Sequence, residues 1–174
     1  MIAMITTFFG IGRLRPAPGT WGSAAAVLLA VLVYEAGGAL LIPLGAVLAA
    51  LVGFWAVPQA LRMTSDEDPS EIVIDEVAGQ WLAMSFTVIP LSRHGISILD
   101  AWPAFVVPFL LFRLFDVWKP WLVGRADRRH DTAGVMLDDL WAGIFAAIAT
   151  ITFINGWNSF LWPLLIGQDP AYRT

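Results

Sequence analysis

Two pairs of adjacent carboxylates stand out because each lies within or next to a long apolar stretch. Asp75 and Glu76 lie in IVIDEVAGQW, and Asp138 and Asp139 lie in GVMLDDLWAG. An ionisable side chain at membrane depth costs about 2.5–3.5 kcal/mol or more, so it usually has a function or a partner. The chain has no cysteine and only two histidines. Oxygen ligands suit a hard cation, so these acids favour Mg²⁺ over Zn²⁺.

A third charged segment, FRLFDVWKPW, places Asp116 between Arg113 and Lys119. Two further basic residues, Arg128 and Arg129, precede the second acid pair in DRRHDTAGVMLDDLWAG. Basic side chains and a divalent cation together can stabilise the charge that develops when a phosphoryl group is transferred. The charged segments therefore indicate chemistry on a phosphate.

The segment RPAPGTWGS near the N-terminus has a different chemistry. Pro18, Gly19 and Thr20 predict a sharp turn, and Gly22 and Ser23 predict the start of a helix. Backbone N–H groups at a helix N-terminus bind phosphate well, and hydroxyl groups can add contacts. The alternative is an ordinary helix cap made by Thr20 or Ser23.

Purely structural roles also fit several of these residues. Asp138 and Asp139 could cap the start of the last helix, where a carboxylate is favoured by the helix dipole. Arg113 and Asp116 could form an i,i+3 ion pair, and the basic loop 125–129 could set the topology or attract anionic lipid. Adjacent helical residues point about 100° apart, so within each acid pair we expect one carboxylate to ligate a metal. The other would orient a ligand or join a second metal.

The overall composition is that of a membrane protein. Hydrophobic residues make up 58% of the 174 residues, charged residues make up 14%, and the mean hydropathy is +0.72. Soluble domains are usually about 45–50% apolar and about 25% charged. The net charge of −4 makes nucleic acid an unsuitable partner. The length fits one domain, residues 1–174.

Apolar segments predict an all-α, polytopic membrane bundle of four to five transmembrane helices. A spanning helix needs about 20 mostly apolar residues, and this standard selects 22–38, 40–60, 72–91, 102–119 and 139–156. The smaller number applies if one segment is re-entrant. Trp157 and Trp162 are expected to anchor the tail at the membrane interface. The first residues lack the charge order of a signal peptide, so we expect them to be retained.

The positive-inside rule gives an orientation for this bundle. With the N-terminus in the cytoplasm, one side of the membrane receives most of the basic residues: Arg13, Arg15, Arg62, Lys119, Arg125, Arg128 and Arg129. The other side receives only Arg93 and Arg173. The three charged segments and RPAPGTWGS then converge on the cytoplasmic face, at the level of the lipid headgroups. This placement suits a phosphorylated lipid headgroup as the substrate.

Four segments together resemble the phosphatidylglycerophosphatase A family of bacterial membrane lipid phosphatases. They are FGIGRLRPAPGTWGS, DPSEIVIDEVAGQW, FRLFDVWKPW and GVMLDDLWAG, which occur in this order over most of the chain. The resemblance implies a mainly helical protein of the bacterial inner membrane with its site facing the cytoplasm. It also implies Mg²⁺-dependent removal of the terminal phosphomonoester of phosphatidylglycerophosphate, which yields phosphatidylglycerol and phosphate.

The resemblance also implies roles for individual residues. The expected catalytic carboxylates are Asp75, Asp116, Asp138 and Asp139. The expected metal ligands are Asp75, Glu76, Asp138 and Asp139. The expected contacts of the substrate phosphate are Thr20, Arg113, Lys119 and Arg129. The chain has Trp121-Leu122 after Lys119-Pro120, where the family usually has a second proline.

Two chemical routes fit these residues. In one, water activated by the metal attacks phosphorus with a carboxylate as base; in the other, an aspartate forms a phosphorylated intermediate. We favour the first route, because the usual aspartyl-phosphate signature is not evident. A competing function is an ion or small-solute transporter with a buried carboxylate site. The charges argue against transport, because they lie at one end of the predicted bundle and do not run through it.

Overall fold

The computed structural model of the chain describes residues 1–63, 70–94, 97–129 and 131–156, and these residues form helices and no strand. Five of the helices are long: α2 (Pro18–Glu35), α3 (Leu41–Leu61), α4 (Ile74–Arg93), α6 (Pro103–Trp118) and α8 (Thr132–Gly156). Four are short: α1 (Ile2–Thr6), the 3-10 helix η1 (Ile11–Arg13), α5 (Ile98–Ala101) and α7 (Trp121–Asp127). The expected all-α fold is confirmed.

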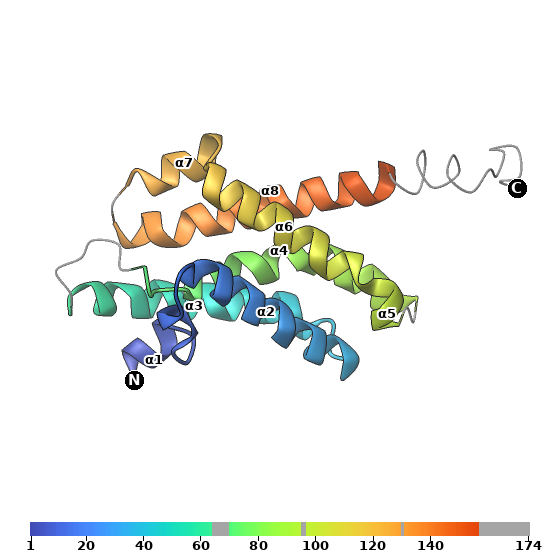
Figure 1. Cartoon of the computed structure of the whole chain (residues 1–174), viewed down its shortest axis with the longest axis horizontal. Helices are drawn as coiled ribbons and strands as arrows, with labels where there is room; N and C mark the ends of the chain where they lie inside the picture. The colour runs from blue at the N-terminus through green and yellow to red at the C-terminus, as the bar shows by residue number, and fades with distance from the viewer. Residues whose placement is uncertain (64–69, 95–96, 130, 157–174) are drawn as a thin grey trace, which may run out of the picture.

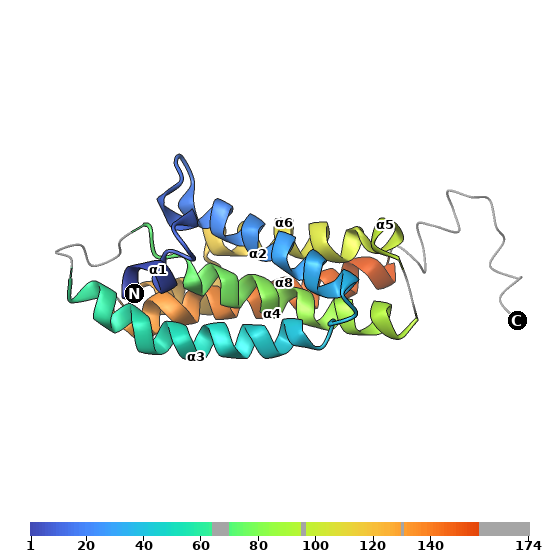
Figure 2. The ribbon, with the colours of Figure 1, turned by 90° about the horizontal axis from the view of Figure 1, so that it is seen from below.

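The long helices run back and forth along one axis and form an elongated bundle (Figures 1 and 2). Helix α4 is central, because it contacts α2, α3, α6 and α8. The N-terminus, α7 and the C-terminal end of α3 lie at one end of the bundle, whereas α5 and the turn between α2 and α3 lie at the other (Figure 1). The predicted convergence of the charged segments therefore has a structural basis, since all of them lie at the first end.

Each predicted span coincides with one long helix, although the bounds differ. Three helices, α2, α3 and α8, are long and apolar enough to cross a membrane. Helix α6 has only 16 residues, and α4, with 20 residues, carries the first acid pair in its first turn. A count of four to five spanning helices stays a prediction. Trp157, Trp162 and Arg173 lie outside the described residues.

The surface of the bundle is that of a membrane protein. On α3, small residues such as Ala46, Gly53 and Ala56 are buried, whereas Leu48 and Leu51 are exposed. Helix α2 shows the same arrangement of small residues inside and leucines outside. Lipid solvates large apolar side chains well, and small residues let the backbones of neighbouring helices approach closely. The chain is therefore a helical membrane protein.

The start of α8 differs from the prediction. The helix begins at Thr132, not near Asp139, and the Asp131 carboxylate accepts a hydrogen bond from the Gly134 N–H at 2.7 Å. This contact caps the first turn. Asp138 and Asp139 consequently lie inside the helix and are buried. Their interpretation as a helix cap is wrong.

Candidate active site

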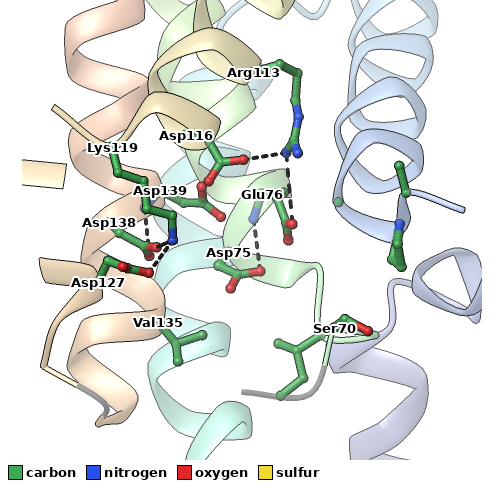
Figure 3. Close-up of a pocket in the computed structure, with 14 residues that line it drawn as sticks. Ser70, Asp75, Glu76, Arg113, Asp116, Lys119, Asp127, Val135, Asp138 and Asp139 are labelled. Atoms are coloured by element: carbon green, nitrogen blue, oxygen red, sulfur yellow. Dashed lines mark hydrogen bonds and ion pairs between the residues drawn. The ribbon is translucent and has the colours of Figure 1, made fainter. Parts of the chain in front are cut away.

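A cavity of about 510 Å³ lies at the charged end of the bundle, between the first turn of α2 and helices α4, α6, α7 and α8. Eight charged side chains of the described residues line it: Asp75, Glu76, Arg113, Asp116, Lys119, Asp127, Asp138 and Asp139 (Figure 3). Seven of these were expected from the sequence. Thr20 and Arg129, the other two expected phosphate contacts, do not line the cavity.

Two glycines set the distance between the helices that carry the acid pairs. A Cβ atom added to Gly143 of α8 would lie 3.1 Å from both Cα and C of Gly79 in α4, and still closer to the Gly79 carbonyl oxygen. The two backbones are therefore in direct contact, as is common where membrane helices cross at small residues. Each glycine lies four residues, or about one turn, beyond a carboxylate, Asp75 or Asp139. The crossing brings the two acid pairs together.

Three carboxylates meet at the base of the cavity. Asp75, Glu76 and Asp139 each offer one oxygen atom, and these atoms lie within 4.8 Å of one another. Asp75 and Asp139 are almost fully buried, and the buried atoms Oε2 of Glu76 and Oδ1 of Asp139 have no hydrogen-bond partner. Buried carboxylate oxygens are costly when unpaired. Their clustering suits a hard divalent cation.

The two acid pairs behave differently. Asp75 and Glu76 both contribute to the carboxylate cluster, although adjacent positions on a helix were expected to diverge. The Asp75 Oδ1 atom also accepts a hydrogen bond from the Glu76 N–H at 3.0 Å. In the second pair the two side chains diverge, as expected for adjacent helical positions: Asp139 joins the cluster, whereas Asp138 Oδ2 lies 3.2 Å from the Lys119 ammonium.

Arg113 connects three helices at one wall of the cavity. Its Nη1 atom lies 2.9 Å from Asp116 on α6 and 4.0 Å from Glu76 on α4. The same atom donates a hydrogen bond of 3.4 Å to the Ser23 hydroxyl on α2. The expected i,i+3 ion pair is confirmed, and it lies within the cavity itself. A structural role and a role in the site are therefore compatible for Arg113 (Figure 3).

Lys119 occupies the opposite wall, directly after α6. Its ammonium group pairs with Asp127 of α7 and with Asp138 of α8 (Figure 3). Its backbone has φ 52° and ψ 52°, a left-handed conformation that is uncommon for a residue other than glycine and that clusters at functional sites. Asp127 was not expected from the sequence. Its role depends on the turn at Lys119, which brings α7 back over the cavity.

The first turn of α2 borders the cavity, as the phosphate-binding interpretation of RPAPGTWGS requires. The helix begins at Pro18, and no side chain caps it. The Ser23 hydroxyl donates a hydrogen bond of 2.8 Å back to the Gly19 carbonyl. The interpretation of Thr20 or Ser23 as a helix cap is therefore wrong. A Cβ atom on Gly19 would collide with the Glu76 carboxylate and lie 3.2 Å from Arg113 Nη1, so only glycine leaves room for that pair.

Arg129 lies on the surface beside the cavity. Its guanidinium group pairs with Asp131 at 2.9 Å, and both side chains are about half exposed. The hydrogen bond from Arg129, together with that from the Gly134 N–H, lowers the pKa of the Asp131 carboxyl. Arg129 therefore pairs with the Asp131 carboxylate that caps the start of α8. His130 lies outside the described residues.

The charges of the cavity are unbalanced. Six carboxylates face two basic groups, Arg113 and Lys119, in the described lining. Carboxylates held together at short range cannot all stay ionised without a compensating cation. The fold and the cavity thus define a helical membrane protein with an acidic site, able to take a divalent cation and, at the basic groups, an anion.

Comparison with known proteins identifies the family. The family model described as phosphatidylglycerophosphatase A matches residues 4–154. Two proteins of that name, from Haemophilus influenzae and Escherichia coli, are each 30% identical to the chain. The first alignment covers 84% of this chain and 85% of the relative, and the second covers 92% and 85%. The chain belongs to the phosphatidylglycerophosphatase A family and is a phosphatase.

Other relatives carry different names. A Bacteroides thetaiotaomicron protein, whose name proposes phosphatidylinositol-3-phosphatase activity, is 36% identical over 83% of this chain and 88% of its own length. A shorter stretch, 46% of the chain, is 33% identical to a third of the sn-glycerol-3-phosphate transport permease UgpE of Yersinia pestis. No solved structure gives a significant match to the chain.

Proposed function

We propose that this lipid phosphatase hydrolyses the terminal phosphomonoester of phosphatidylglycerophosphate, with Mg²⁺, in the synthesis of phosphatidylglycerol. The observation that carries the proposal is the cavity itself. It combines three clustered carboxylates with Arg113 and Lys119 at one end of a membrane bundle. The family name supports the choice of substrate.

Asp75, Glu76 and Asp139 would hold the metal, because each offers an oxygen to the cluster. Glu76 Oε2 and Asp139 Oδ1 are also buried with no hydrogen-bond partner. Asp138 was also expected to be a ligand. It lies next to Asp139 but pairs with Lys119, so we assign it to the other wall of the cavity. Bound between the carboxylates, Mg²⁺ would supply positive charge beside the phosphate and lower the pKa of a water molecule.

The basic groups are assigned to the phosphate. Arg113 and Lys119 lie on opposite walls of the cavity (Figure 3), so a phosphate between them would meet positive charge on both sides. Each group would exchange part of its present pairing with a carboxylate for a charge-assisted hydrogen bond to the phosphate. Thr20 and Arg129 lie outside the lining. Their roles stay predictions that alanine variants test.

The remaining carboxylates, Asp116 and Asp138, are assigned to proton transfer. Water adds its oxygen to phosphorus, the bond between phosphorus and the lipid oxygen breaks, and the lipid oxygen takes a proton to become the hydroxyl of phosphatidylglycerol. The balance is one water consumed, with one alcohol and one inorganic phosphate released. Asp116 and Asp138 line the cavity beside Arg113 and Lys119, where a carboxylate can accept or return this proton. Attack by an aspartate first, followed by hydrolysis, has the same balance.

We propose the bacterial inner membrane as the location, with the cavity facing the cytoplasm. At the end of the bundle that holds the cavity, the described basic residues outside the cavity are Arg13, Arg15, Arg62, Arg125, Arg128 and Arg129. The opposite end has Arg93. Positive charge retained on the cytoplasmic side sets the orientation of membrane helices.

Transport is the second candidate, and the partial likeness to a permease is the observation that favours it. The interior of the bundle argues against it. Beyond the acid pairs the described core holds four buried polar side chains, Gln80, Ser85, Thr87 and Thr150, and none of them is charged. Ile42, Met84, Val88 and Phe105 pack together in an apolar cluster, which interrupts a polar path along the bundle.

A substrate panel tests the proposal. Purified protein in detergent micelles would be given phosphatidylglycerophosphate, phosphatidylinositol 3-phosphate or glycerol 3-phosphate, and inorganic phosphate would be measured. We expect turnover to be fastest with phosphatidylglycerophosphate. Faster turnover of phosphatidylinositol 3-phosphate would assign the other lipid, in line with the Bacteroides relative. Absence of phosphate release, together with uptake of glycerol 3-phosphate into proteoliposomes, would favour transport.

A further inference from the structure

A smaller hollow lies between α2 and α6, two of the helices that border the cavity. Its volume is about 150 Å³, and its lining is apolar: Ala24 and Val27 of α2, with Val106 and Phe109 of α6. Val106 is exposed, and the other three residues are partly buried. The hollow is therefore open to the surroundings of the bundle, and its apolar side chains can contact lipid acyl chains. We call it the α2–α6 groove.

The groove continues the cavity along the same helix faces. On α6, Val106, Phe109 and Arg113 follow the i, i+3, i+7 spacing of one helix face. On α2, Ala17 lines the cavity, and Ala24 lies seven residues further along the same face. At a rise of 1.5 Å per residue, Phe109 lies about 6 Å and Val106 about 10 Å from Arg113 along the axis of α6. On α2, Thr20 lies on this face between Ala17 and Ala24.

We propose that the α2–α6 groove holds part of an acyl chain of the phospholipid substrate while its phosphate occupies the cavity. This inference rests on the proposed lipid substrate and adds how its apolar part is recognised. With the terminal phosphate between Arg113 and Lys119, the rest of the lipid must leave the cavity toward the hydrocarbon region. The groove is an apolar surface on that path, and it is reached without crossing another helix.

Binding at the groove would make the enzyme discriminate between lipids and soluble phosphomonoesters. The deacylated headgroup, glycerophosphoglycerophosphate, has the same phosphomonoester but no chain to bury. Each methylene group removed from water favours binding, so a few methylene contacts account for a large preference. Filling the groove should remove this preference and leave the chemistry at the phosphate unchanged.

Ala24→Phe is the variant that tests the groove. A cavity of about 150 Å³ accommodates a ring the size of benzene, so the new side chain would occupy most of the space. Leu28→Phe is the matched control, because Leu28 is on the same helix but 63% exposed and does not line the groove. Neither residue lines the cavity that contains the charged groups.

The readout is kcat/KM for long-chain phosphatidylglycerophosphate and for its deacylated headgroup. We expect Ala24→Phe to lower the value for the lipid by about tenfold or more, equivalent to about 1.4 kcal/mol. The value for the deacylated headgroup should stay that of the wild type, and Leu28→Phe should change neither. Equal losses on both substrates, or no loss on the lipid, would overturn the proposal.

A binding measurement tests lipid binding at the groove independently of the proposed activity. Phosphatidylglycerol with a diazirine on its acyl chain would be crosslinked to the wild type and both variants, and the labelled peptides would be mapped. We expect labelling of the groove residues, reduced by Ala24→Phe and not by Leu28→Phe. Labelling spread evenly over all lipid-facing helices would overturn the proposal that the groove is a specific acyl-chain site. If the wild type hydrolysed no phosphatidylglycerophosphate but the groove were still labelled, the proposed substrate would be wrong and the proposed acyl-chain site would be supported.

Discussion

The contact between α4 and α8 gives a prediction that follows from backbone geometry alone. In Gly143→Ala, the new methyl group would lie 3.1 Å from Cα and C of Gly79 and closer to its carbonyl oxygen. The atoms that it meets belong to the backbone, so no side chain can rotate away. The two helices must therefore separate, and with them Asp75 and Asp139.

Two magnitudes follow from this separation. Overpacking a well-packed contact typically costs about 1–3 kcal/mol of stability. Displacement of catalytic groups by about 1 Å can cost about 10²-fold in rate. We therefore expect Gly143→Ala to lower kcat by about 10²-fold while the variant still folds and inserts.

The assay is phosphate release in detergent micelles, with the thermal midpoint measured on the same samples. Gly156→Ala is the matched control, because Gly156 is also on α8 and an added Cβ atom there would meet nothing within 4 Å. The control should keep both activity and thermal midpoint. Full activity and an unchanged midpoint in Gly143→Ala would refute the close crossing of α4 and α8.

Three further perturbations follow from the cavity and its surroundings. Gly19→Ala should reduce turnover with little loss of stability, because its methyl group would displace the Glu76–Arg113 pair; comparison of kcat with the thermal midpoint checks this. Lys119→Met should lower kcat by about 10²-fold or more if Lys119 stabilises the phosphate charge, and unchanged kcat would remove it from that role. The pKa of Asp131 is lowered in the folded protein by Arg129 and the Gly134 N–H, so its stabilising effect is present above the ordinary pKa and lost as the pH falls through the lowered one. Asp131→Ala should thus lower the thermal midpoint at pH 7 more than at pH 3, and equal effects would contradict the pairing.

The sequence predicted the long helices well because apolar length is a strong signal. It also predicted which segments converge, because alternating membrane crossings place every second connection on one side. The charged residues of the cavity were predicted because an ionisable side chain in lipid is costly and therefore usually has a function or a partner. Seven of the eight charged residues that line it were identified in this way.

The features that were missed depend on tertiary contacts. The start of α8 was placed too late because Asp138 and Asp139 resemble a helix boundary in sequence. In the fold they are buried against α4 and α6, and the helix continues through them. Asp127 gave no signal, since an acid in a polar loop is ordinary until Lys119 turns the chain toward it. The pairing of Gly79 with Gly143 depends on how each helix is rotated, which hydropathy does not define.

The expected contacts Thr20 and Arg129 show a further limit of reading roles from motifs. Each lies close in sequence to residues that line the cavity, but neither lines it. Thr20 lies in the first turns of α2 but outside the lining, and Arg129 pairs with Asp131. A motif identifies a segment of chain, whereas helix geometry decides which of its side chains reach the site.

The most direct test of a metal-dependent phosphatase site at the carboxylate cluster is phosphate release from phosphatidylglycerophosphate by purified protein, with Mg²⁺ or with EDTA. Asp139→Asn would be compared with Glu35→Gln, an exposed acid at the other end of the bundle. We expect release that requires Mg²⁺, that is lost in Asp139→Asn and that is retained in Glu35→Gln. Release that persists in EDTA, or that survives in Asp139→Asn, would contradict the assignment of the cluster as the metal site.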